Sequence, residues 1–156
     1  MSKDNVTLNV NGQEHTVEDA TRLLLHVLRD DLGLVGARGS CGVGMCGTCT
    51  VLLDGRAVSS CLMMAAQAEG KAITTIEGLG EDGALHPVQQ AYIDHFGFQC
   101  AYCTPGFILS TVALLEETPD PDEGEIREYL AGNLCRCGSY VNILRAVKAA
   151  AKNGPE

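Results

Sequence analysis

Eight cysteines carry the most distinctive chemistry in this chain of 156 residues, and they form two separate groups of four. The first group contains Cys41, Cys46, Cys49 and Cys61, and three of these thiols fall within the glycine-rich stretch GSCGVGMCGTC. The second group contains Cys100, Cys103, Cys135 and Cys137. Cysteines clustered in this way typically bind metal or do redox chemistry in an intracellular protein.

The spacing of the first group predicts a [2Fe–2S] cluster. Cys41-x4-Cys46-x2-Cys49, with a fourth cysteine further along, is the plant-type ferredoxin pattern. The glycines between the thiols suit such a cluster, because they allow backbone N–H groups to approach its sulfurs closely. A four-cysteine zinc site is the alternative, but zinc sites usually show short paired spacings rather than this triplet.

The second group is less specific by itself, since the pairs Cys100-x2-Cys103 and Cys135-x-Cys137 could also hold zinc. Its position along the chain favours a second iron–sulfur cluster. Cys103 directly precedes a predicted helix start at Thr104-Pro105, and Cys137 lies two residues before a predicted start at Ser139. Helix N-termini present free N–H donors and partial positive charge, which stabilise an anionic group.

The first half of the chain contains the pattern of a small sheet wrapped around one helix. Two strands at 6–10 and 13–17 are joined by an Asn-Gly turn, and a second hairpin joins 49–53 to 56–59 through Asp-Gly. A further strand is predicted at 72–77. Apolar residues recur at helical spacing from Ala20 to Leu32, and Gly33 follows as a C-terminal cap.

The composition changes at the polar, glycine-rich segment 78–87, which we interpret as a linker between domains 1–79 and 80–156. Four helices are predicted after it. The first starts at Pro87 and has an apolar stripe that reaches Phe96. Thr104 is the predicted cap of the second, with Pro105 at its first position. A capping box formed by Asp122 and Glu125 starts the third, and Ser139 caps the fourth.

The overall composition excludes some classes of function. The net charge is −9 and no lysine or arginine cluster occurs, so we expect no nucleic-acid partner. No apolar run approaches the length of a membrane span, and we expect no membrane insertion. The segment 1–13 lacks the apolar core of an export signal, which predicts a cytoplasmic location.

Three motifs in order resemble the iron–sulfur subunits of the molybdenum hydroxylases, the family of xanthine dehydrogenase, aldehyde oxidoreductase and carbon monoxide dehydrogenase. They are GSCGVGMCGTC, FQCAYCTPG at 98–106 and GNLCRCGSY at 132–140. The resemblance covers almost the whole chain. It implies an α+β fold in which a β-grasp, plant-type ferredoxin-like domain is followed by a four-helix bundle. One [2Fe–2S] cluster would be held in each domain by the two cysteine groups.

The resemblance also implies cofactors and partners on other chains. A large subunit would bind molybdopterin near the bundle cluster, and a medium subunit would carry FAD. By the motif match, Gln99 would hydrogen-bond the pterin, and Cys137 would be the cluster ligand nearest to it. The family usually reads C-R-C-T-G-Y, whereas this chain has Gly138-Ser139 in place of Thr-Gly. This difference leaves all the cysteines in place and alters the backbone expected at the pterin contact.

The sequence therefore predicts the electron-transfer subunit of a heteromeric molybdenum hydroxylase, with no catalytic residue and no substrate site of its own. Electrons would pass from the molybdopterin centre through two [2Fe–2S] clusters to the acceptor subunit. One alternative is an independent two-cluster ferredoxin that serves several enzymes. Another, from a different class, is a zinc-stabilised interaction module.

Overall fold

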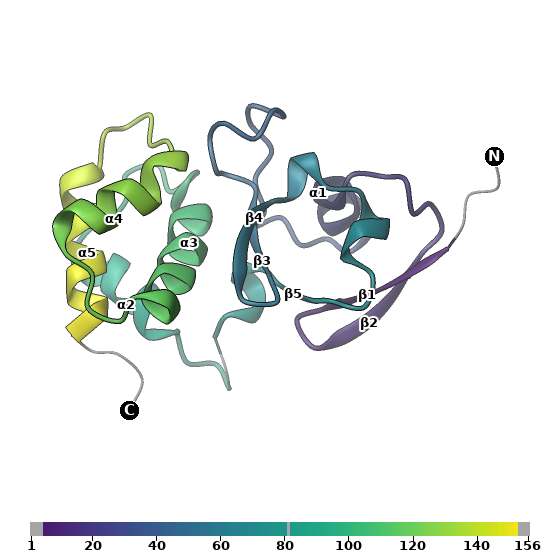
Figure 1. The fold of residues 1–156 in the computed structure, drawn as a ribbon, viewed down its shortest axis with the longest axis horizontal. Helices are drawn as coiled ribbons and strands as arrows, with labels where there is room; N and C mark the ends of the chain where they lie inside the picture. Colours follow the sequence, from purple (N-terminus) through teal and green to yellow (C-terminus); the bar gives the residue numbers. More distant parts are fainter. Residues whose placement is uncertain (1–4, 81, 153–156) are drawn as a thin grey trace.

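The computed structural model describes residues 5–80 and 82–152, in which a sheet domain and a helical domain lie side by side (Figure 1). Residues 1–4, Glu81 and 153–156 belong to the predicted domain ends and linker and lie outside the described residues. The ferredoxin-like fold with a helical C-terminal part, predicted from the sequence, is confirmed.

A five-stranded sheet forms the first domain, with the order β2-β1-β5-β3-β4. Its strands are β1 Val6–Val10, β2 Gln13–Val17, β3 Thr50–Leu53, β4 Arg56–Ser59 and β5 Ala72–Thr74. β1 and β5 pair in parallel, and the remaining neighbours are antiparallel. Both hairpins predicted from Asn-Gly and Asp-Gly are present. Val6, Leu8 and Val10 alternate with exposed residues and bury one face of β1 in the core.

The helix that covers the sheet is shorter and less regular than predicted. α1 spans Leu24–His26 and continues as a π-helical turn over Val27–Asp31, so the regular helix expected from Ala20 to Leu32 was wrong at both ends. The wide turn accompanies two hydrogen bonds from Arg29 to the carbonyls of Val35 and Ala37, which hold the following segment against it. Buried Leu24, Leu28 and their neighbours still fill the core.

The predicted strand at 72–77 is also too long, because β5 ends at Thr74. At Thr75 the backbone N–H donates to the Asn11 side chain at 2.9 Å, and the Asn11 amide donates back to the Thr75 hydroxyl at 3.0 Å. A side chain from the first hairpin thus replaces the next rung of the ladder. The chain then turns into a 3-10 helix at Ile76–Gly78.

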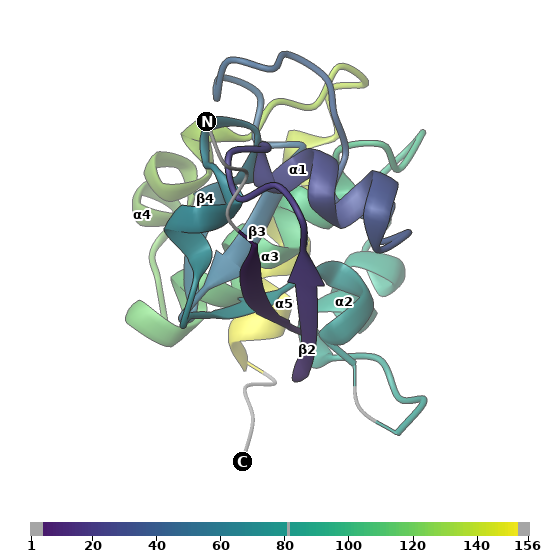
Figure 2. The ribbon, with the colours of Figure 1, turned by 90° about the vertical axis from the view of Figure 1, so that its right-hand side faces the viewer.

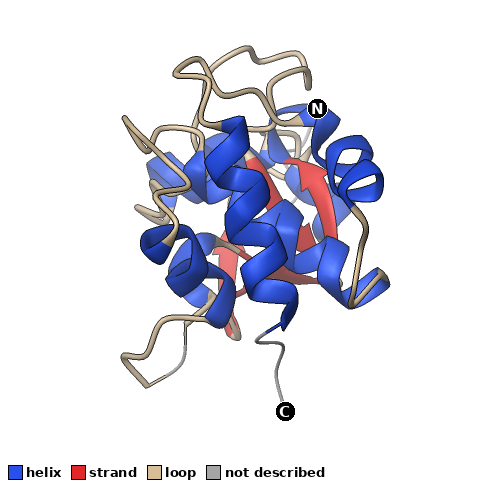
Figure 3. Ribbon diagram, turned by 90° about the vertical axis from the view of Figure 1, so that its left-hand side faces the viewer, coloured by secondary structure: helices blue, strands red, loops and turns tan. Residues whose placement is uncertain are grey.

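Four α-helices of the described residues form the second domain. They are α2 Pro87–Asp94, α3 Thr104–Glu117, α4 Glu123–Tyr129 and α5 Tyr140–Lys152. Seen from the helical side, they stand in front of the sheet (Figure 3). No helix in 5–80 or 82–152 is both long enough and apolar enough to cross a bilayer.

Some predicted helix starts are confirmed and others are wrong. Asp122 and Glu125 form the expected capping box, with hydrogen bonds of 2.9 and 2.7 Å to each other's backbone N–H. Thr104 is the first helical residue rather than the cap, and Cys103 takes the cap position. The buried Ser139 hydroxyl has no hydrogen-bond partner, so it does not cap α5. Phe96 follows the end of α2 and is exposed instead of extending the apolar stripe.

The two domains meet where α3 lies against β3. All four residues of β3 are buried: Val51 and Leu53 belong to the sheet core, whereas Leu52 belongs to the core of the helical domain. Gly106 of α3 comes so close to the main chain at Gly47 that a Cβ atom would overlap the Gly47 carbonyl oxygen. A glycine is required at position 106 for the domains to meet in this way.

We therefore predict that Gly106→Ala destabilises the chain, although alanine is the better helix former. The added methyl group must push α3 away from the Gly47 main chain, and overpacking of this kind costs about 1–3 kcal/mol. Denaturant unfolding of the cluster-loaded protein measures the change. Gly132→Ala is the matched control, because no atom lies within 4 Å of the position that its methyl group would take. Equal stability of the two variants would contradict the prediction.

Candidate metal centres

The cysteine-bearing loops gather at one end of the molecule. In Figures 1 and 2 the loop at 41–49 and the loop at 132–139 both lie at the top, the first over the junction of the two domains and the second over the helical domain. The fold brings the four thiols of the second group together, brings those of the first group together in two pairs, and forms no disulfide among the eight. The two groups come from different domains but share this end of the structure.

In the first group the thiols lie in two pairs. Cys41 interacts with Cys46, and the buried Cys49 interacts with Cys61. The Val43 N–H donates to the Cys41 sulfur at 3.5 Å, and hydrogen bonding from this and neighbouring amides lowers the pKa of Cys41 to about 6. Burial has the opposite effect on Cys49 and raises its pKa to about 11. The loop side of the group favours thiolate, while the core side disfavours it.

The glycines give the loop the backbone that these amide contacts need. Gly42, Gly44 and Gly47 have φ angles of +67°, +73° and +67°, in the left-handed region that other residues rarely adopt. Gly44 also lies against the Leu62 side chain, which a Cβ atom would overlap. The predicted role of the glycines, in which they turn N–H groups toward the sulfurs, agrees with the Val43 contact.

The second group repeats the paired arrangement on a helical scaffold. Cys100 interacts with Cys137, and Cys103 interacts with Cys135, so each pair joins the two cysteine segments. Hydrogen bonding from the Tyr102 amide lowers the pKa of Cys100, and burial raises the pKa of Cys103 to about 12.

Cys135 shows the competition between burial and hydrogen bonding within one residue. Burial by itself raises its pKa, but amide hydrogen bonds, including a 3.4 Å contact from Ser139 N–H to its sulfur, lower the pKa overall. The Ser139 amide precedes α5, so the helix start contributes a donor as the sequence predicted, through its backbone rather than its hydroxyl.

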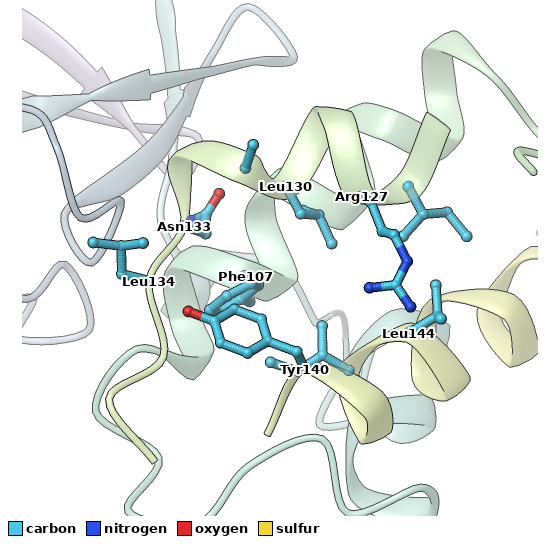
Figure 4. Close-up of a pocket in the computed structure, with 10 residues that line it drawn as sticks. Phe107, Arg127, Leu130, Asn133, Leu134, Tyr140 and Leu144 are labelled. Atoms are coloured by element: carbon cyan, nitrogen blue, oxygen red, sulfur yellow. The ribbon is translucent and has the colours of Figure 1, made fainter. Parts of the chain in front are cut away.

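Tyr140 is hydrogen-bonded to the loop that carries Cys135 and Cys137. Its hydroxyl accepts a hydrogen bond from the Cys135 N–H at 2.9 Å, and its ring packs edge-on against Phe107. Figure 4 shows both rings beside a cavity of about 210 Å³ that continues toward Leu130 and Arg127. The cavity is mainly apolar and no cysteine lines it. The residues around it therefore support the cysteine loop and are not themselves part of the metal site.

The donor set fits a binuclear iron–sulfur cluster in each group. In a [2Fe–2S] cluster each iron takes two thiolates, and the thiols of both groups meet two by two. Among the described residues, both buried side-chain oxygens without a hydrogen-bond partner, on Thr104 and Ser139, lie within two residues of a cysteine of the second group.

Main-chain contacts link the two groups directly. The Leu134 N–H donates to the Cys46 carbonyl at 2.9 Å, and Leu134 immediately precedes Cys135. The buried Asn133 amide donates to the Gly47 carbonyl at 3.2 Å. A short bonded path, with one hydrogen bond in it, therefore connects a cysteine of the ferredoxin domain to a cysteine of the bundle.

Sequence reasoning did not identify Asn133, Tyr102 or Arg38 as residues of this region. Tyr102 donates to the Gly39 carbonyl at 2.6 Å, and the Arg38 guanidinium lies over its ring. The available signals were an aromatic residue between two cysteines and a cation three residues before Cys41.

Comparison with known proteins decides the family. Residues 7–75 match the family described as 2Fe-2S iron–sulfur cluster binding domain, and residues 75–148 match the [2Fe-2S] binding domain family. The chain is 51% identical over 149 residues to a nicotinate dehydrogenase subunit of Pseudomonas putida, covering 94% of each protein. It is 47% identical to the aldehyde oxidoreductase iron–sulfur-binding subunit of Escherichia coli, covering 94% of this chain and 71% of the relative. The chain belongs to the iron–sulfur subunits of the molybdenum hydroxylases.

Solved structures of molybdenum hydroxylases have the same fold. Quinoline 2-oxidoreductase from Pseudomonas putida 86 has a chain that superposes with a TM-score of 0.91 at 36% identity, covering 97% of this chain and 96% of that one. Aldehyde oxidoreductase from Desulfovibrio gigas superposes with a TM-score of 0.89 at 42% identity over 95% of this chain, which corresponds to 17% of that longer chain. This molybdenum hydroxylase subunit thus has two [2Fe–2S]-binding domains, as the sequence predicted.

We expect the protein purified without air to contain four iron atoms and four acid-labile sulfides per chain, because each group of four thiols fits one [2Fe–2S] cluster. Metal analysis and sulfide determination measure this directly. Stoichiometric zinc in place of iron would contradict the prediction.

Separate cysteine substitutions should remove the clusters one at a time. Cys49→Ser should abolish the paramagnetic resonance signal of the ferredoxin-domain cluster, and Cys103→Ser that of the bundle cluster, since the two groups share no thiol. Each variant acts as the control for the other. Loss of both signals from a chain that remains folded would show that the two sites are not independent.

Proposed function

We propose that this chain carries electrons from a large molybdopterin-binding subunit to a medium FAD-binding subunit. When bound, each [2Fe–2S] cluster accepts and releases one electron. Cys41, Cys46, Cys49 and Cys61 hold the ferredoxin-domain cluster, and Cys100, Cys103, Cys135 and Cys137 hold the bundle cluster. The chain's own part is to bind the clusters, shield them and fix their relative position.

The hydrogen bond between Leu134 and Cys46 is the observation that carries this proposal. It joins the two cysteine groups through the main chain at 2.9 Å, and the main chains at Gly47 and Gly106 lie in close contact beside it. An interaction module stabilised by zinc needs no such link between its sites. A relay between two redox centres does need it, because its centres must stay at a constant separation.

The residues exposed beside each cysteine group support a position for each partner. Gln99 is exposed next to Cys100, and its amide has no hydrogen-bond partner among residues 5–80 and 82–152. This supports the role of Gln99 as a ligand of the pterin, with Cys137 as the nearest thiol. Beside the first group Val43, Met45 and Leu62 are more than half exposed, and apolar surface of this kind favours a protein interface. We place the acceptor subunit there.

We further propose the domain division at 79/80 and a cytoplasmic location. Two separate cores support the division, although Leu52, Ala57 and Ile76 of the first part pack into the second core. Eight cysteines with no disulfide among them suit a reducing compartment, in which disulfides are rare.

The substrate belongs to the large subunit. The relative named for nicotinate and the relative named for an aldehyde are 51% and 47% identical to this chain. Comparable similarity to proteins named for such different molecules supports a subunit that has no part in choosing the substrate.

The order of the two centres can be tested in the assembled complex. With Cys49→Ser, substrate should still reduce the bundle cluster, because that site and the Gln99 surface are unchanged, but the acceptor subunit should receive no electrons. Rapid-freeze paramagnetic resonance follows the first event, and flavin absorbance follows the second. Acceptor reduction at the normal rate, or loss of bundle reduction, would contradict the proposed order.

An independent two-cluster ferredoxin remains the alternative to be tested against this proposal. Purification of the chain at its natural level separates the two possibilities. We expect a stoichiometric complex that contains molybdenum and flavin, and a freely soluble chain without either would favour the ferredoxin.

A further inference from the structure

Arg38 of the ferredoxin domain reaches across the domain boundary to Tyr102 of the bundle. The carbon at the centre of its guanidinium lies 5.4 Å from the centroid of the Tyr102 ring, within the range of a cation–π interaction. The Tyr102 hydroxyl donates to the carbonyl of Gly39, the next residue after Arg38, at 2.6 Å. Two adjacent residues of the ferredoxin domain, Arg38 and Gly39, thus both contact the Tyr102 side chain of the bundle.

Tyr102 is placed where such a contact affects the bundle site. It lies between Cys100 and Cys103, and its own N–H is a hydrogen-bond donor to the Cys100 sulfur. Anything that fixes Tyr102 therefore fixes the segment that presents two of the four thiols. The guanidinium that lies over the Tyr102 ring belongs to Arg38 of the other domain.

The positive charge of Arg38 is fixed in position and not neutralised nearby. Its backbone is tied to the cluster loop by Arg38 N–H to Thr48 O at 3.0 Å and by the Thr48 hydroxyl to Arg38 O at 2.9 Å. Its Nε is buried without a hydrogen-bond partner. Within the described part of the chain, no carboxylate forms an ion pair with it. A guanidinium stays protonated at all relevant pH values.

We propose that Arg38 raises the reduction potential of the bundle cluster from across the domain boundary, with Tyr102 as the residue that positions it. This inference rests on the proposed function, because it takes Cys100 and Cys103 to be cluster ligands. Reduction adds one electron, supplied by the partner's molybdenum centre, so it increases the negative charge of the site. A fixed cation beside the ligand segment stabilises the reduced form more than the oxidised form.

The side chain's direction predicts which cluster responds more. Arg38 is close in sequence to Cys41, but its guanidinium is held over Tyr102 and therefore points to the bundle segment. The ferredoxin domain would in this way tune the centre that receives electrons first, and it could do so only when the two domains are docked.

Potentiometric titration of the purified complex, followed by paramagnetic resonance of both clusters, tests the inference. Arg38→Gln should lower the midpoint potential of the bundle cluster more than that of the ferredoxin-domain cluster. Arg38→Lys keeps the charge and should give a smaller shift. Tyr102→Leu removes the ring that holds the guanidinium and should lower the same potential. Arg56→Gln is the control for net charge, and it should leave both potentials unchanged, since Arg56 starts β4 at the turn of the β3–β4 hairpin, at the other end from Cys49 and Cys61.

Three results would overturn the inference. They are an unchanged bundle potential in Arg38→Gln, equal shifts in Arg38→Gln and Arg38→Lys, and an equal shift in Arg56→Gln. If Arg38→Gln does not assemble, Tyr102→Leu and Arg38→Lys still decide, because the former must shift the bundle potential more than the latter. Absence of two cluster signals from the unsubstituted complex would instead contradict the proposed function, so the two failures are distinguishable.

Discussion

The close approach of the main chains at Gly47 and Gly106 is the constraint on which the rest of this structure depends. It brings α3 against β3 without intervening side chains, and β3 is buried on both faces as a result. The Gly47 carbonyl then accepts from Asn133, and the neighbouring Cys46 carbonyl accepts from Leu134. Both cysteine groups therefore lie next to this contact between the domains. The packing of the two domains also sets the distance between the two redox sites.

The two cysteine groups must each stabilise and shield an anionic cluster, and they do so in the same way on unrelated scaffolds. In each, a thiol on the loop side accepts amide hydrogen bonds that lower its pKa, as Cys41 and Cys100 do. In each, a partner on the core side has its pKa raised by burial, as Cys49 and Cys103 do. A glycine-rich loop supplies the amides in one domain, and the Tyr102 amide, between two cysteines, supplies the main one for Cys100 in the other. Donors and burial together provide for an anionic cluster that must be both stabilised and shielded.

This arrangement suits a subunit that connects other proteins. Gln99 lies exposed beside one group, and apolar Met45 lies exposed beside the other, so each site has its own outward surface. Between these surfaces, Arg38 and Tyr102 form a cation–π contact in addition to the hydrogen bonds across the domain boundary. In the proposed function the chain would link two partners through fixed internal geometry, and the choice of substrate would belong to another subunit.

The sequence by itself determined the two cysteine groups, the hairpins, the capping box at Asp122 and the family, because these depend on local spacing and turn chemistry. It also predicted four helices, but it misplaced the cap at Thr104 and extended the helix after Ala20 too far. It also extended the strand after Ala72 beyond Thr74, where Asn11, distant in sequence, replaces the partner that a continuing strand would have at Thr75. Only the tertiary structure decided which thiols pair, how Gly106 meets Gly47 and where Arg38 points. The thiol pairs depend on how segments far apart in the sequence pack within each domain, and the other two depend on contacts across the domain boundary, which no local pattern in the sequence encodes.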